Sequence, residues 1–395
     1  MEQPVILSAS RTAIAAFQST LSPMTAPQLG SVAIRSALSK AGIPQEELAK
    51  HRSEVIMGQV LAAGVGQAPA RQASIYAGIP QSVPALTINK MCGSGLKAVM
   101  LAAQAIITGD AEIVVAGGQE SMTNAPYLLP KARSGYRMGN GEIIDSMMHD
   151  GLIDAYDRGS MGVYGDMCAR EYGFTREAQD EFAVTSYKRA QEAQQRGWFT
   201  EEIAAVEVPD KKGTILFTTD EGPSRAQFDK IPTLKPAFSK DGTVTAANAS
   251  SINDGAAALV LTSITKARDL GIAPLARIIA QASYAQAPQW FTTAPVGAIR
   301  SVLAKAGLRP EDIDLYEINE AFAVVPMAVE QDLCIPRERI NIHGGAIALG
   351  HPIGASGARI LTTLLYALRR TGKRIGLATL CIGGGEASAV IVEML

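Results

Sequence analysis

Met91-Cys92-Gly93-Ser94-Gly95 separates a strand-like run at residues 85–89 from a helical pattern that begins at residue 96. The apolar residues of that pattern fall on one helical face, and they are Leu96, Val99, Met100, Ala103 and Ile107. The glycines suit a sharp turn between the strand and the helix. The positive end of the helix dipole favours a thiolate here, which makes Cys92 a candidate nucleophile. A buried structural cysteine is the competing interpretation.

The composition of the chain is that of a globular protein with a large core. Of its 395 residues, 47% are hydrophobic and 19% are charged, and the formal net charge is −2. This length is enough for two or three domains. Because no long basic or acidic block occurs, we expect neither nucleic acid nor a membrane surface as the main partner. The N-terminus resembles neither a signal peptide nor a transit peptide, and no run of about 18 apolar residues occurs.

The number and spacing of the cysteines indicate the cellular compartment. They stand at positions 92, 168, 334 and 381 and include no CxxC pair, so we expect neither a disulfide framework nor a zinc site. A reducing compartment is the better fit, and we expect a cytoplasmic protein. Cys168 and Cys334 lie in amphipathic contexts and are expected in the core.

Strands and helices alternate along the chain. Apolar runs at residues 5–8, 54–57 and 112–116 predict strands, and residues 28–41, closed by Gly42, predict a helix. This alternation is typical of an α/β protein with a mainly parallel sheet and helices on both faces.

The order of these elements returns late in the chain. Residues 36–42, SALSKAG, are echoed by residues 301–307, SVLAKAG. Ser94-Gly95, a helix and a strand ending in two glycines are echoed by Ser356-Gly357, a helix and a strand ending in three. A repeat in the same order predicts two similar α/β halves. In that register Cys92 corresponds to His351, so the two loops are expected to face one another across a pseudo-twofold axis.

The residue pattern of the segment between the two halves differs from that of the halves. We assign residues 1–121 to an N-terminal half, completed by about 246–270, and residues 271–395 to a C-terminal half. Residues 122–245 form an inserted loop domain. It contains one clear helix, from the cap Thr175 to Arg196, and a small hairpin around residues 211–213. Insertions at strand ends are where ligand specificity tends to lie.

Polar residues follow two predicted strands of the C-terminal half. Asn319 ends the strand at 314–318, where its amide can donate or position a water, although it can also be a simple helix cap. His351 lies in the glycine-rich stretch 341–357 ahead of a helix, where it can act as a base. For His343, in the same stretch, a structural role is preferred.

A second thiol stands at the end of another strand. Cys381-Ile382-Gly383-Gly384-Gly385 follows the apolar run 375–380. Cys381 can serve as an acid, and the glycine N–H groups can point at a developing oxyanion. A dinucleotide-binding loop is the alternative, but the spacing is not GxGxxG and a strand rather than a helix follows.

Four blocks together resemble the signature blocks of the thiolases. They are residues 89–95, 319–323, 344–352 and 381–385, and the similarity extends over essentially the whole chain. The resemblance is strongest to the acetyl-CoA acetyltransferase (acetoacetyl-CoA thiolase) branch, and within it to the mitochondrial type. It implies the thiolase fold, which is α/β with two duplicated halves in five layers, α-β-α-β-α, and an inserted loop domain.

The resemblance implies a role for each catalytic candidate. Cys92 would take the acyl group as a thioester after His351 deprotonates it. Cys381 would remove the α-proton of the second acyl-CoA. Asn319, through a water, and His351 would stabilise the enolate, and the N–H groups of Cys92 and Gly383 would hold the tetrahedral oxyanion. Capture on the enzyme gives ping-pong kinetics, and no cofactor is required beyond coenzyme A as substrate or product.

The resemblance also implies binding residues and an assembly. The loop domain would cover the coenzyme A site. The residues expected at that site are Arg225, Lys230, Ser250, Phe238, Ala246, Phe322, Met161 and Phe291. A potassium ion, as in the mitochondrial type, would involve Tyr187, Ala246, Ala247, Ala249 and Ile347, largely through backbone carbonyls. The family expectation for the assembly is a homotetramer built as a dimer of dimers.

Some positions depart from the family pattern. Ser160 stands where acetoacetyl-specific thiolases usually carry His, and Ser251 and Glu386 replace residues that are commonly smaller. These changes affect the expected acyl chain length and the tolerance of a 2-methyl group. A broader 3-ketoacyl-CoA thiolase of fatty-acid degradation is therefore the nearest alternative. A ketosynthase acting on acyl carrier protein is disfavoured by Cys381, and a non-catalytic acyl-CoA carrier by the full set of catalytic candidates.

Overall fold

The computed structural model describes residues 2–211 and 213–395. Eleven of its strands join into one sheet, whose main path has the order β13-β14-β15-β12-β1-β11-β5-β3-β4. The strands of the N-terminal half are β1 (Pro4–Thr12), β3 (Ser53–Gly58), β4 (Ala85–Ile88), β5 (Ile113–Ser121) and β11 (Asn253–Ser263). Those of the C-terminal half are β12 (Ala276–Ala285), β13 (Leu315–Ile318), β14 (Ile375–Ile382) and β15 (Glu386–Met394). The short strands β2 (Ala15–Ala16) and β8 (Ile203–Ala204) pair with β11 and β1.

The two halves repeat one topology. The order β1-β11-β5-β3 on one side matches β12-β15-β14-β13 on the other. The polarity also matches, because each series has two antiparallel pairs followed by a parallel pair. The halves meet where β1 pairs with β12 at Val5–Arg277 and Ile6–Ala276. The predicted duplication is therefore confirmed.

The expectation of a mainly parallel sheet is wrong. Parallel pairing requires a crossover connection, whereas β14 and β15 are joined directly by the turn Gly383-Gly384-Gly385 and pair antiparallel. In the N-terminal half, β11 returns from the long insertion and runs antiparallel to both of its long neighbours. The sheet is mixed, and the late strand of each half accounts for this.

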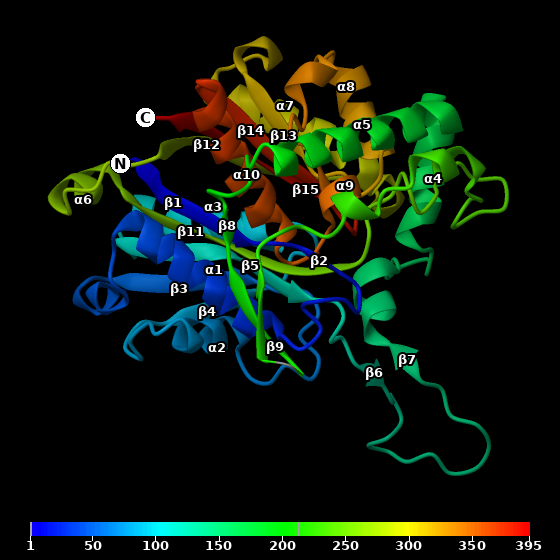
Figure 1. Cartoon of the computed structure of the whole chain (residues 1–395), viewed down its shortest axis with the longest axis horizontal. Coiled ribbons are helices and arrows are strands. Elements are labelled where there is room, and N and C mark those ends of the chain that lie inside the picture. Colours follow the sequence, from blue (N-terminus) through cyan, green and yellow to red (C-terminus); the bar gives the residue numbers. More distant parts are fainter. Residues whose placement is uncertain (1, 212) are drawn as a thin grey trace.

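Helices form three layers around the strands. The outer layers contain α1 (Ala26–Ala41) and α2 (Pro69–Tyr76) on one side and α7 (Ala294–Ala306) and α8 (Val324–Leu333) on the other, with α3 (Ser94–Thr108) and α10 (Ser356–Thr371) between the halves (Figure 1). A separate buried apolar cluster fills each of these three regions. This is the predicted five-layer order. The short helices α6 (Ile264–Asp269) and α9 (Ala346–Leu349) lie in connections.

The repeated Ser-Gly pairs lie where α3 and α10 touch. A Cβ on Gly357 would lie 2.3 Å from the backbone N of Leu96, and one on Gly95 would lie 2.8 Å from the backbone N of Ala358. Neither position can accept a larger residue without moving backbone. The pseudo-twofold contact of the central helices therefore explains why the two sequence blocks share this dipeptide.

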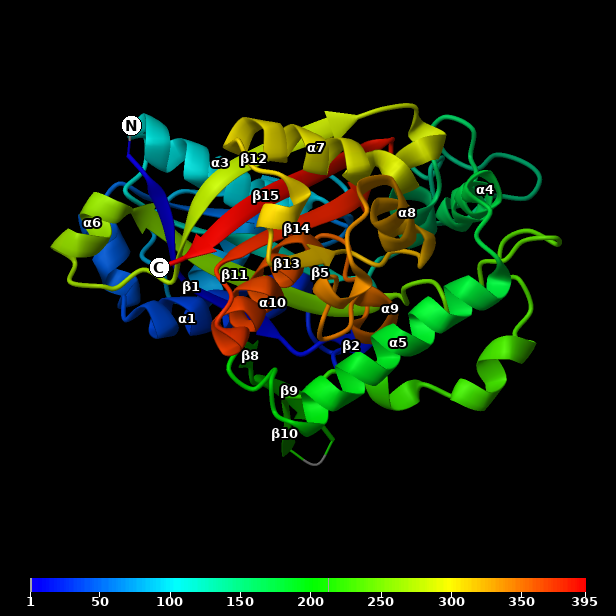
Figure 2. The ribbon, with the colours of Figure 1, turned by 90° about the horizontal axis from the view of Figure 1, so that it is seen from above.

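The inserted segment is built largely of loops and two helices. Its helices are α4 (Met161–Tyr172) and α5 (Arg176–Gln195), and its short strands are β6 (Tyr127–Leu128), β7 (Ile144–Asp145), β9 (Val206–Asp210) and β10 (Gly213–Phe217). The side chain of Thr175 caps α5 as predicted. The hairpin β9–β10 lies close to its expected position, with Lys212 of its turn outside the described residues. Both ribbon views show α5 beside α9 of the C-terminal half (Figure 2).

One apolar stretch, Met91–Thr108, passes a length and composition test for a membrane-spanning helix among the described residues. It contains α3, which packs between the two halves with Leu96, Val99 and Ala102 fully buried. Its hydropathy is therefore explained by its place in the central layer.

Candidate active site

The turn that carries Cys92 is held by its own side chains. Met91 adopts a left-handed backbone conformation with φ of 45°. Its N–H donates to Asn89 Oδ1 at 2.9 Å, and its carbonyl accepts from Ser94 Oγ at 2.7 Å. The N–H of Lys90 donates to the same hydroxyl at 2.8 Å. This network fixes the thiol two residues before α3.

Cys92 faces the glycine loop of the other half. Burial raises the pKa of the half-buried Cys92 thiol to about 11, while the backbone N–H groups of Gly383 and of Cys92 itself act in the opposite direction. Desolvation therefore outweighs the favourable effect of the helix start and of these contacts, and the resting thiol is protonated. A base is needed to ionise the thiol, and the two N–H groups form a ready oxyanion site.

Cys381 lies close to the Cys92 turn, because a Cβ on Gly93 would lie 2.3 Å from Cδ1 of the adjoining Ile382. It ends β14, is 1% exposed, and has a pKa raised well above the ordinary value by burial first and by the charge of Cys92 second. It packs in the apolar cluster that contains Phe291 and Phe322. Two reduced thiols from opposite halves thus lie in one region of the molecule.

His351 is a neutral base that two side chains hold in place, one at the ring and one at the backbone. Its Nδ1 lies 2.6 Å from Ser356 Oγ, whose own proton goes to the carbonyl of Pro352 at 2.9 Å. The hydroxyl therefore accepts from Nδ1–H, which leaves the lone pair on Nε2. The backbone N–H of His351 donates to Asn253 Oδ1 at 2.9 Å. Burial lowers the pKa of His351 to about 3, so the ring is neutral near pH 7.

Asn319 belongs to this site and does not cap a helix. Helix α8 begins five residues later at Val324, with Ala323 as its N-terminal cap residue, so the capping alternative is wrong. The Asn319 side chain is fully buried, and its Nδ2 lies 3.5 Å from His351 Nε2. Its Oδ1 has no partner within the described ranges. The Asn319 amide and the His351 imidazole therefore meet at the C-terminal end of β13.

Aromatic and thioether side chains form a wall around the thiols. The ring of Phe322 lies 6.2 Å from that of Phe238 and 6.3 Å from that of Phe291. A Cβ on Gly383 would lie 3.6 Å from Met161 Sδ, at the start of α4. The loop domain therefore contributes Met161 to the same place as the glycine loop, and these four predicted residues are brought together.

The other predicted coenzyme A residues are distributed differently. The N–H of Ser250 donates to the carbonyl of Ala321 at 2.9 Å, which ties residues 246–250 to the segment next to Phe322. Arg225 instead pairs with Glu221 at 3.0 Å and with Ser19 at 2.8 Å, and its side chain is 53% exposed. Lys230 is also exposed, and no described contact joins either cation to the aromatic wall.

Two of the residues predicted to hold potassium, Tyr187 and Ile347, lie beside the buried carboxylate of Glu320. Tyr187 and Ile347 pack in one cluster, and the N–H of Ile347 donates to Glu320 Oε2 at 3.2 Å. Burial first and the charge of Glu320 second raise the pKa of Tyr187. The turn at residues 246–249 is held by the N–H of Thr245 donating to Asn248 Oδ1 at 2.7 Å. The described residues contain no group of three His, Cys, Asp or Glu side chains with metal-ligand geometry.

Two residues of the site were missed by sequence reasoning. Ser356 and Asn253 position His351, yet neither residue type stands out in the sequence. The signal for Ser356 was its place five residues after His351 in the repeated Ser-Gly pair. For Asn253 there was no local signal, because it lies 98 residues from His351 in the chain.

The remaining histidine and cysteine predictions have mixed outcomes. Cys168 is buried, but Cys334 is exposed at the end of α8, where it adopts a left-handed conformation with φ of 52°. The expectation of a core position for Cys334 is therefore wrong. His343 is buried against the rings of Trp198 and Phe199 at 5.2 and 6.1 Å, which fits a structural role.

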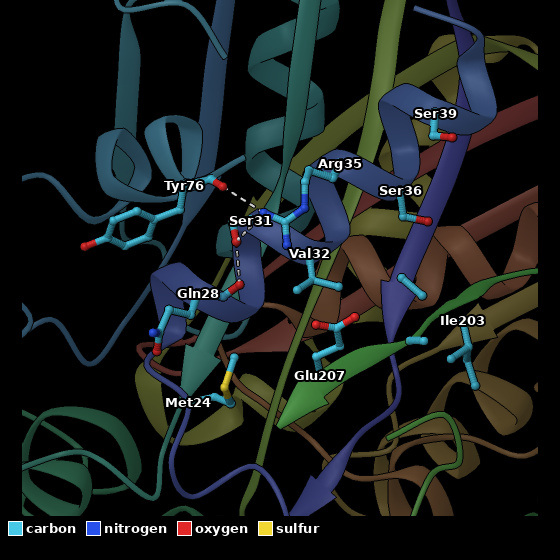
Figure 3. Close-up of a pocket in the computed structure, with 12 residues that line it drawn as sticks. Met24, Gln28, Ser31, Val32, Arg35, Ser36, Ser39, Tyr76, Ile203 and Glu207 are labelled. Carbon is cyan, nitrogen blue, oxygen red and sulfur yellow. Dashed lines mark hydrogen bonds between the residues drawn. The ribbon is translucent and has the colours of Figure 1, made fainter. Parts of the chain in front are cut away.

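A hollow of about 820 Å³ lies elsewhere, on the outer face of α1 (Figure 3). Figure 3 shows Arg35 pointing toward the carbonyl of Tyr76, to which it donates at 2.7 Å, with Glu207 across the hollow. None of the predicted catalytic or substrate-binding residues lines it. This hollow is thus separate from the thiol site.

Comparison with known proteins agrees with this architecture. The sequence profile of the thiolase N-terminal domain matches residues 4–265, and that of the thiolase C-terminal domain matches residues 272–394. The chain is 54% identical over 395 residues to the acetyl-CoA acetyltransferase of Cupriavidus necator, covering 100% of both chains. It is 51% identical over 392 residues to the acetyl-CoA acetyltransferase of Pseudomonas aeruginosa, covering 99% of both.

Solved structures show the same similarity. The crystal structure of the Bacillus anthracis acetyl-CoA acetyltransferase matches with a TM-score of 0.97 and 39% identity, covering 100% of this chain and 99% of that one. The structure of a thiolase from Ascaris suum in complex with coenzyme A matches with a TM-score of 0.94 and 43% identity over 100% of both chains. The resemblance of the four sequence blocks and the predicted fold are confirmed, and this chain belongs to the thiolase family.

Proposed function

We propose that this thiolase is an acetyl-CoA C-acetyltransferase, which condenses two acetyl-CoA molecules to acetoacetyl-CoA and catalyses the reverse thiolysis. The observation that carries the proposal is the meeting of Cys92 with Cys381 and the Gly383 N–H. The relatives named acetyl-CoA acetyltransferase, similar over their full length, support the same substrate. Coenzyme A would be the carrier in both directions, and no separate cofactor is needed for this chemistry.

The first half-reaction follows from the protonation states. The neutral His351 takes the proton of Cys92 at Nε2, and the thiolate attacks the carbonyl of acetyl-CoA. The tetrahedral oxyanion lies between the N–H groups of Cys92 and Gly383. Loss of one such donor typically costs about 3 kcal/mol, so the glycine loop is a large part of the catalysis. The C–S bond to coenzyme A then breaks, and the leaving thiolate takes a proton.

The second half-reaction uses the second thiol. Once ionised by giving its proton to the leaving coenzyme A, Cys381 removes a proton from the methyl group of a second acetyl-CoA. Its raised pKa makes its thiolate the stronger base for this demanding proton transfer. His351 and Asn319, which lie together at 3.5 Å, would stabilise the enolate oxygen. The enolate carbon attacks the acetyl group on Cys92, and the Cys92 thiolate leaves and recovers its proton from Nε2 of His351.

The main alternative is a 3-ketoacyl-CoA thiolase of broader chain length. The wall formed by Met161, Phe291 and Phe322 supports the short substrate because these bulky side chains pack in the same cluster as Cys381. The test is a thiolysis profile of 3-ketoacyl-CoA substrates from four carbons upward. A marked preference for acetoacetyl-CoA is expected, and equal rates for longer chains would favour the alternative.

We further propose that residues 122–245 cover the coenzyme A site and that a potassium ion binds near Tyr187. The ion would be held by the Tyr187 hydroxyl and by carbonyls of Ala246, Ala247, Ala249 and Ile347. The buried Glu320 supports this, because its carboxylate supplies negative charge beside oxygen ligands. The potassium ion would order the loop that contains Ser250.

A homotetramer in the cytoplasm completes the proposal. The sheet ends at β4, whose outer edge is unpaired and carries Leu86 with 43% exposure. The loop between β6 and β7 extends away from the body (Figure 1), with Tyr127 69% and Met138 99% exposed. Two separate apolar surfaces are what a dimer of dimers requires. The need for two reduced thiols supports a cytoplasmic location.

A further inference from the structure

The Cys92 turn meets the glycine loop and its flanking residues at three positions. The Cys92 thiol lies at the N–H of Gly383. A Cβ on Gly93 would lie 2.3 Å from Ile382 Cδ1, so these segments are in direct contact. At the outer end of the seam, Lys90 Nζ donates to the carboxylate of Glu386. The two segments therefore run side by side in opposite directions.

The glycine loop is the short turn between β14 and β15, and the pair Ile382–Glu386 closes the ladder between these two strands. Gly384 and Gly385 have φ values of 92° and 87°, in the left-handed region. Gly385 is anchored by its carbonyl, which accepts from the N–H of Gln286 at 2.8 Å. Gly383 and Gly384 have no side chains that could anchor this part of the loop. The direction of the Gly383 N–H thus depends on what holds the loop at its two ends.

Glu386 is the first residue after the glycines with a side chain that can act as an anchor. Its ion pair with Lys90 has side-chain exposures of 37% and 22%. Within residues 2–211 and 213–395, no other ion pair joins the Cys92 turn to the glycine loop. Lys97 of α3 lies close to this ion pair, since the charges of Lys90 and Glu386 both affect the pKa of Lys97.

We propose that Lys90 and Glu386 are positioning residues whose ion pair holds the Gly383 N–H in place over the Cys92 sulfur. The pair acts through the loop and touches no reacting atom. It connects the nucleophile of one half to the oxyanion donor of the other, so it sets the geometry of the oxyanion site across the pseudo-twofold seam. This rests on the proposed acyl transfer to Cys92.

The proposal separates two properties of Cys92 that usually change together. Acylation by acetyl-CoA needs the Gly383 N–H on the developing oxyanion, whereas alkylation by iodoacetamide forms no oxyanion. A displaced glycine loop should therefore slow acylation more than alkylation, because alkylation loses only the N–H contact that favours the Cys92 thiolate. Loss of an oxyanion donor typically lowers the rate by about 10²- to 10³-fold, and a misplaced donor should cost about tenfold.

The test variant is Lys90→Met with Glu386→Gln, which removes both charges and keeps the net charge. The matched control is Lys266→Met with Glu112→Gln, because that pair has similar exposures of 19% and 30% at 3.0 Å and lies outside the site. A charge-swapped variant, Lys90→Glu with Glu386→Lys, tests rescue. Each protein is mixed with acetyl-CoA in a single-turnover acylation and, separately, with iodoacetamide, with Cys92 followed by peptide mass spectrometry.

The expected result is acylation reduced about tenfold in the test variant, with a clearly smaller loss of Cys92 alkylation and unchanged KM for coenzyme A. The swapped variant should recover most of the rate, and the control should match the wild type. Wild-type acylation rates in the test variant would overturn the proposal, as would an equal loss of alkylation or a failure of the swap to recover. Absence of acylation in the wild type would instead refute the proposed function.

Discussion

The hydroxyl of Ser356 lies 2.6 Å from Nδ1 of His351, while its proton is donated to the carbonyl of Pro352. This arrangement determines the tautomer of the imidazole, because the hydroxyl can only accept from Nδ1–H. The lone pair is thereby placed on Nε2, on the side of Asn319. A residue that touches no substrate thus decides which nitrogen is the base.

We predict that Ser356→Ala lowers kcat by about 10- to 100-fold with little change in KM, by analogy with the loss of partners that orient other functional histidines. The variant leaves Nδ1–H without its acceptor in a buried site, which favours rotation of the ring or the other tautomer. Steady-state kinetics in the thiolysis direction measure the effect. An unchanged kcat would show that the hydroxyl does not control the base.

The two thiols are predicted to separate the two half-reactions. Cys381→Ala should still become acetylated on Cys92, because His351 and the oxyanion site remain. It should fail to condense, because no base is left for the α-proton. Acetyl transfer is followed by the release of coenzyme A and condensation by the appearance of acetoacetyl-CoA. A Cys381→Ala protein that condenses at the wild-type rate would refute the assigned role.

Stability should depend on pH through His343. Burial lowers its pKa from 6.5 to about 3, so the unfolded chain binds a proton that the folded protein does not. The stability associated with the neutral ring is present above pH 6.5 and is lost as the pH falls toward 3. We predict that His343→Phe weakens this acid dependence by up to about 1.4 kcal/mol per pH unit. Urea titrations of both proteins between pH 4 and 7 measure the difference, and parallel curves would contradict it.

Potassium should activate the enzyme if its site is the one proposed. Thiolysis in KCl is expected to exceed that in NaCl at equal ionic strength, with the difference mainly in KM for coenzyme A. Tyr187→Phe removes the hydroxyl ligand and should weaken this dependence while it leaves the packing against Phe228 intact. A rate that is the same in both salts would remove the potassium site from the account.

Much of the fold could be predicted because the repeat leaves direct marks in the sequence. Ser94-Gly95 and Ser356-Gly357 recur because two central helices touch through their backbones. The strand polarity was misjudged because βα alternation hides late strands such as β11, which returns from a distant insertion. Local pattern reports which segments are strands, but pairing direction depends on long connections.

The catalytic candidates could be predicted for a similar reason, but the shift of the Cys92 pKa could not. Cys92, Cys381, His351 and Asn319 stand next to glycines or strand ends, which local sequence shows. The sign of the Cys92 pKa shift depends on burial by the opposite half, which no local pattern contains. Asn319 resembled a helix cap because a helix does follow it, although five residues later.

The most direct test of the central claim is the position of the acetyl group after brief mixing of the wild-type enzyme with acetyl-CoA. Rapid acid quenching, digestion and peptide mass spectrometry locate the group. The account predicts one acetyl group per chain on Cys92, removed when coenzyme A is added. An acetyl group on Cys381 or on any other residue, or full turnover without an acetylated Cys92, would contradict it.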